Sequence, residues 1–135
     1  MILSNFPLLL NYHLAAPAII RIVTALFFLV SGFQKCTSRR EQYTNLSASF
    51  GLKPSLLFTL FVAAAEIVGG FLLLIGLFTQ ITSLVLLVII VVAIFLKTQQ
   101  PNILERSQLS YILLAAILCS LLLSGAGSFA LDLPL

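Results

Sequence analysis

Glu66 is the residue of this chain whose surroundings most strongly suggest chemistry. It lies in the apolar run over residues 57–76 and is the only charged residue between Lys53 and Lys97. A carboxylate inside such a segment is costly, so it should face protein or a cavity rather than lipid. A buried ionisable group of this kind can hold a structural ion pair or line a functional site, and both interpretations of Glu66 remain open.

Arg21 and Asp132 are the groups expected to share a buried polar centre, or a ligand site, with Glu66. Arg21 is the only charge in the apolar run over residues 16–33, and Asp132 follows the last apolar run. At the helical rise per residue, the axial offset between Arg21 and Glu66 is about 6–10 Å, which an arginine side chain largely spans. We therefore predict that Arg21 points inward and pairs with Glu66, directly or through water. Asp132 is the rival partner, and the alternative for Arg21 is to reach the lipid head groups.

The remaining reactive side chains do not form a catalytic motif. Cys36 and Cys119 are too far apart for a Cys-x-x-Cys motif, so both are expected to serve as small apolar residues. A lone histidine, His13, cannot supply paired axial haem ligands. The sequence shows no phosphate-binding glycine loop and no zinc-ligand cluster. We expect no catalytic residue, no metal and no intrinsic cofactor, so redox work would need an external molecule such as a quinone.

The composition is that of a membrane protein. The mean hydropathy is +1.18, with 61% hydrophobic and only 8% charged residues. The apolar residues form long runs instead of narrow stripes, which is typical of transmembrane helices. A net charge of +3 gives no support for nucleic-acid binding. The 135 residues have room for one compact bundle, so we treat 1–135 as a single membrane domain.

Four apolar runs predict an all-α fold, a bundle of four transmembrane helices. These helices should cover about residues 16–34, 55–77, 80–97 and 107–124. Pro17 and Pro54 stand near the first two helix starts, where proline is tolerated. Between these two helices, Tyr43, Leu46 and Phe50 recur at helical spacing among charged residues. This pattern predicts a short interfacial helix within residues 38–50.

Positive charge predicts the orientation of the bundle. The loops expected to carry it contain Lys35, Arg39, Arg40 and Lys53 after the first helix, and Lys97 and Arg106 after the third. Basic loops face the cytoplasm, so both termini should lie on the outer side. We expect an integral protein of a bacterial inner membrane with periplasmic termini.

Five glycines are expected to support helix packing. Gly69, Gly70 and Gly76 follow Glu66 in the second predicted helix, and Gly125 and Gly127 close the fourth. Small residues let neighbouring helices approach closely. The Gly-Gly pair one turn after the acid either packs against a neighbour or leaves room for a ligand head group, and packing is the favoured interpretation.

The order of these motifs resembles the DoxX family of small four-helix membrane proteins. The matching segments are Arg21, residues 31–35 at the end of the first predicted helix, 50–54 before the second, 65–77 within it and 124–132 after the fourth. The family typically ends with Gly-x-Gly followed by Ser-Leu-Asp. Here Ala130 replaces the serine, whereas Leu131 and Asp132 remain. The resemblance covers nearly the whole chain and implies a four-helix bundle that works with a partner.

The resemblance does not imply one reaction. Similar proteins are associated with thiosulfate:quinone oxidoreductase subunits, with membrane redox or detoxification complexes, and with chaperone or cargo-receptor roles. Three classes therefore remain. We favour a non-catalytic accessory, scaffold or assembly subunit of a membrane redox or respiratory complex, with the lipid bilayer and other membrane subunits or copies of itself as partners. The alternative is a quinone-binding subunit of an oxidoreductase. A small transporter or proton relay ranks last, because the two halves of the chain are dissimilar.

Overall fold

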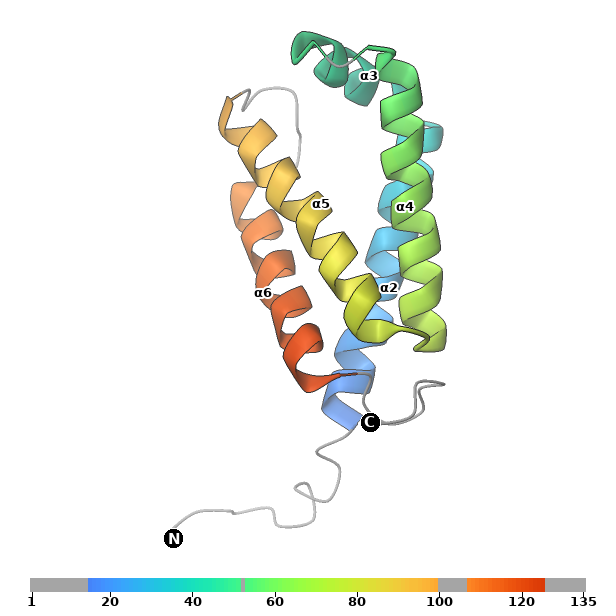
Figure 1. Cartoon of the computed structure of the whole chain (residues 1–135), viewed down its shortest axis with the longest axis vertical. Helices are drawn as coiled ribbons and strands as arrows, with labels where there is room; N and C mark the ends of the chain where they lie inside the picture. Colours follow the sequence, from blue (N-terminus) through green and yellow to red (C-terminus); the bar gives the residue numbers. More distant parts are fainter. Residues whose placement is uncertain (1–14, 52, 100–106, 126–135) are drawn as a thin grey trace, which may run out of the picture.

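The fold is built from helices arranged in a bundle (Figure 1). The computed structural model describes residues 15–51, 53–99 and 107–125, and every regular element in these ranges is a helix. The helices are α2 (Ala15–Cys36), α3 (Arg40–Ser49), α4 (Ser55–Ile75), α5 (Thr79–Gln99) and α6 (Gln108–Ser124). The all-α class is thus confirmed. The short α3 lies across one end of the longer helices (Figure 1).

Three of these helices, α2, α4 and α5, are long and apolar enough to cross a membrane. Their lengths of 22, 21 and 21 residues match the requirement of about 20 residues for a spanning helix. The apolar α6 is shorter, with 17 residues. Large apolar side chains are exposed on each of the four, for example Ile19, Phe61, Ile81 and Leu123. A bundle with so apolar an outer surface is suited to lipid contact.

Local signals end the helices where the chain must turn. Pro54 has an extended backbone (φ −77°, ψ 119°) directly before α4. Gly76 ends α4 in the left-handed region (φ 74°, ψ 39°), and its N–H donates to the carbonyls of Leu72 and Leu73. Gly125 ends α6 with φ 74°, and a Cβ there would meet no atom of the described residues within 4 Å. Gly76 and Gly125 thus both serve as helix caps. Gly127 lies outside the described residues.

Two glycines bring α2 and α4 into backbone contact. A Cβ added at Gly70 would lie 2.9 Å from the carbonyl oxygen of Ala25, and one at Gly32 would lie 2.9 Å from that of Ala63. Real Cβ atoms do not approach backbone oxygens so closely, so only glycine fits at this spacing. These two contacts define the antiparallel register of α2 against α4.

Gly69 faces a different neighbour from Gly70. A Cβ at Gly69 would lie 2.9 Å from a methyl carbon of Leu86 on α5. Leu86 is fully buried and belongs to the apolar core with Phe28, Leu73 and Leu118. The Gly-Gly pair therefore packs on two sides at once, against α2 through Gly70 and against α5 through Gly69.

Candidate functional site

Glu66 forms a buried ion pair with Lys35. The ammonium of Lys35, near the end of α2, donates to Oε1 of Glu66 in the middle of α4. Glu66 is 2% exposed and Lys35 is 8% exposed. The other carboxylate oxygen, Oε2, is buried and has no hydrogen-bond partner among the described residues. One oxygen of the acid is therefore engaged, and the second still lacks a donor.

The structure pairs Glu66 with Lys35, whereas the sequence predicted Arg21 as its partner. Arg21 does lie inside the bundle, with 2% exposure. The register set by Gly32 and Gly70, however, places Glu66 beside the C-terminal half of α2. At the helical rise, Arg21 lies about 20 Å further along α2 from Lys35. Asp132, the rival partner, lies outside the described residues.

Lys35 is the residue that the sequence analysis missed, because it was counted as a charge of the loop after the first helix. The structure extends α2 to Cys36 and places Lys35 on its buried face. The spacing of residues along this helix did indicate that Lys35 faces inward. Arg21, Phe28, Gly32 and Lys35 follow one another at intervals of three, four or seven residues, which puts them on one side of a helix. That side faces the rest of the bundle.

The short helix α3 covers the end of the bundle where the ion pair lies. The ammonium of Lys35 lies 5.0 Å from the centre of the Tyr43 ring, a cation–π distance. The hydroxyls of Ser47 on α3 and Thr59 on α4 are 3.2 Å apart and connect the two helices. Each hydroxyl also lies within hydrogen-bond distance of a backbone carbonyl of its own helix, so the two protons are shared among three acceptors. The helix expected within residues 38–50 is therefore present, and its inner face helps to enclose the pair.

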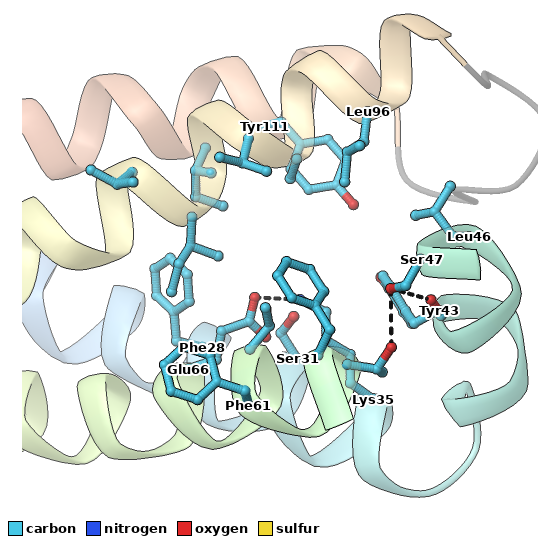
Figure 2. Close-up of a pocket in the computed structure, with 18 of the residues that line it drawn as sticks. Phe28, Ser31, Lys35, Tyr43, Leu46, Ser47, Phe61, Glu66, Leu96 and Tyr111 are labelled. Carbon is cyan, nitrogen blue, oxygen red and sulfur yellow. Dashed lines mark hydrogen bonds and ion pairs between the residues drawn. The ribbon is translucent and has the colours of Figure 1, made fainter. Parts of the chain in front are cut away.

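A cavity of about 240 Å³ adjoins the ion pair (Figure 2). Side chains of all five described helices line it: Phe27, Phe28, Ser31 and Lys35 of α2; Tyr43, Leu46 and Ser47 of α3; Phe58, Thr59, Phe61, Val62 and Glu66 of α4; Val88, Ile89, Ile90, Val92, Ala93 and Leu96 of α5; and Tyr111 of α6. Leu96 and Tyr111 lie across the cavity from Ser31 and Lys35 (Figure 2). An apolar cavity of about 150 Å³ can hold benzene, so this one has room for a substituted ring.

The cavity opens to the outer surface between α4 and α5. Its lining residues on these helices include Phe61, which is 73% exposed, and Val88, which is 57% exposed. Phe28 and Tyr111, which line it from α2 and α6, are buried. The α5 ribbon moves away from α4 as it leaves their connecting turn, and the cavity lies toward this wider end (Figure 1). In a bilayer the opening would face the lipid.

A family model for DoxX matches residues 16–99, which is more than half of the chain. This chain belongs to the DoxX family. The match includes α3 and both members of the ion pair, and together with the apolar helices it identifies the DoxX protein as an integral membrane protein. Comparisons with curated proteins and with solved structures gave no match.

The two cysteines of the DoxX protein lie on different helices and are both free. Cys36 is half-buried at the end of α2, and Cys119 is exposed on α6. No group of three or more His, Cys, Asp or Glu side chains comes together among the residues of the described ranges. The ion pair and its cavity are thus the feature of the DoxX protein to which a ligand is most readily assigned.

Proposed function

We propose that this DoxX protein is an integral membrane subunit that binds a small apolar molecule, of the quinone class, in the cavity beside Lys35 and Glu66. The observation that carries the proposal is the coincidence of a buried ion pair with a cavity that is otherwise almost wholly apolar. Ligand sites typically combine apolar walls with a few polar groups that orient the ligand. The cavity therefore favours the quinone-binding alternative over a purely structural accessory role.

The chemistry of the cavity suits a quinone head group. The aromatic side chains of Phe28, Phe58 and Tyr43 line it and can contact a ring. Lys35 brings ammonium donors to one end, where a quinone oxygen can accept. The opening between α4 and α5 gives direct access from the bilayer, where such molecules dissolve. The protein would hold the molecule for a partner subunit of a redox complex, which would supply the electron carriers.

The orientation in the membrane follows from the charges at the α3 end. We propose that α2, α4, α5 and the shorter α6 all cross the bilayer, and that α3 lies at the cytoplasmic interface. Arg39, Arg40 and Lys97 lie at or near this end of the bundle. The cavity would then lie in the cytoplasmic half of a bacterial inner membrane, with both termini on the periplasmic side.

Quinone retained during purification tests the proposal. The wild-type protein, purified into lipid nanodiscs and extracted with organic solvent, is expected to contain quinone. Lys35→Met with Glu66→Gln should retain about tenfold less, because hydrogen bonds to charged groups contribute about 1.5–3 kcal/mol. Glu41→Gln is the matched control, since it makes the same carboxylate-to-amide change on the exposed face of α3. Wild-type protein that co-purifies with a larger complex but contains no quinone would instead support the accessory role.

The opening between α4 and α5 makes a separate prediction about the rate of binding. Val92→Trp adds bulk to a half-exposed residue of the cavity wall and should slow association of a short-tailed benzoquinone by about tenfold or more. Val91→Trp is the control, because Val91 is exposed on the same helix but does not line the cavity. Both rates can be followed in nanodiscs by rapid filtration. Equal rates for the two variants would show that the ligand enters by another route.

A further inference from the structure

We infer that the cavity selects a head group with a hydroxyl donor, and therefore binds the reduced quinol in preference to the oxidised quinone. The inference rests on the proposed function, because it concerns the ligand of the same cavity. It follows from the hydrogen-bonding capacity that the ion pair leaves unused.

Glu66 supplies a hydrogen-bond acceptor that no donor among the described residues satisfies. Oε1 of Glu66 accepts from Lys35, whereas Oε2 is buried without a hydrogen-bond partner among the described residues. An ionised carboxylate only accepts hydrogen bonds, and burying one of its oxygens unsatisfied is unfavourable. Glu66 lines the cavity, and the terminal torsion of a glutamate side chain is broad. Because Oε2 itself is buried, binding of a ligand donor requires that the carboxylate turn about this torsion to present its second oxygen.

Lys35 supplies an N–H donor to the same end of the cavity. A lysine ammonium has three N–H groups. One of those of Lys35 is directed to Glu66, and the ammonium also lies near the face of the Tyr43 ring. At least one N–H group thus remains for a ligand oxygen. The hydroxyls of Ser47 and Thr59 have acceptors in each other and in backbone carbonyls of their own helices, so neither is left as a free donor for the ligand.

A ligand hydroxyl can form hydrogen bonds with both Lys35 and Glu66, whereas a ligand carbonyl can accept only from Lys35. The oxygen of a quinol accepts from Lys35 while its O–H donates to Oε2 of Glu66. The oxygen of a quinone accepts from Lys35 and leaves Oε2 unsatisfied. The difference is one hydrogen bond to a charged acceptor, which corresponds to about a tenfold preference or more for the quinol.

Binding of the two redox forms to one protein preparation tests this inference. A short-tailed benzoquinone and its quinol are titrated anaerobically into nanodiscs that contain the full chain, by calorimetry. We expect the Kd of the quinol to be lower by about tenfold or more. The dimethyl ether of the same quinol keeps the ring and both oxygens but has no donor, so it should bind as weakly as the quinone. This comparison needs only the wild-type protein.

Variants then assign the preference to the pair. Lys35→Met with Glu66→Gln should bring the two Kd values to within about twofold, and Glu41→Gln should leave the preference unchanged. Equal affinity of the wild type for both forms, or tighter binding of the quinone or the dimethyl ether, would overturn the inference and leave the proposed function standing. Failure of every one of these compounds to bind would overturn the proposed function, and the inference with it.

Discussion

Glu66→Gln alone is expected to lower the free energy of unfolding by about 3–5 kcal/mol, because it leaves the Lys35 ammonium buried without its carboxylate. Lys35→Met alone should have a comparable effect, since it leaves the acid without its cation. The double variant should be much closer to the wild type than the sum of the two changes, because replacing a whole buried pair by neutral groups is often nearly neutral. Unfolding by SDS in mixed micelles, followed by circular dichroism, measures all four proteins.

The Arg21 variants are the control for this cycle. Arg21 lies in the same helix as Lys35 and is also buried, but it is distant from Glu66 along the helix axis. The effects of Arg21→Met and Glu66→Gln should therefore add. Additive effects of Lys35→Met and Glu66→Gln, together with strong coupling between Arg21 and Glu66, would contradict the pairing described here.

Gly70→Ala is expected to destabilise the bundle by about 2–3 kcal/mol, in line with other overpacked cores. Its new methyl group would lie 2.9 Å from the carbonyl oxygen of Ala25 and 3.0 Å from the backbone nitrogen of Leu29. Backbone atoms of α2 cannot move aside unless the whole helix shifts. The same unfolding measurement reports this effect, and a shift of α2 should also reduce quinone retention because Lys35 would move with it.

Gly69→Ala is the matched control for Gly70→Ala. It makes the same change at the adjacent position of the same helix, with the same gain in helix propensity of about 1 kcal/mol. The nearest atoms to its methyl group would be Cδ2, Cγ and Cδ1 of the Leu86 side chain, which can shift more readily than backbone. The free energy of unfolding should therefore fall by less than about 1 kcal/mol. A larger loss at Gly69 than at Gly70 would mean that α5, and not α2, is the helix held most rigidly against α4.

The sequence alone predicted the features that depend on neighbouring residues or on the order of residues along the chain. Hydropathy over consecutive residues located the apolar helices, and the start of α4 after Pro54 is set by a local signal. The DoxX resemblance is a matter of motif order and was confirmed by the family match. Glu66 was expected inside the bundle because an isolated carboxylate in an apolar run has no favourable place in lipid.

Only the tertiary structure decided which residue meets Glu66. The answer depends on how far α2 is displaced along α4, and a shift by a few turns exchanges one basic residue for another. The contacts of Gly32 and Gly70 set that displacement, and they bring Lys35 to the acid instead of Arg21.

The cavity is likewise a tertiary feature. It lies where α5 diverges from α4 and where α3 closes the end, and five helices contribute to its walls. Hydropathy along the chain determines that each helix is buried in an apolar environment, whereas the register and the angles between helices determine which polar groups meet inside.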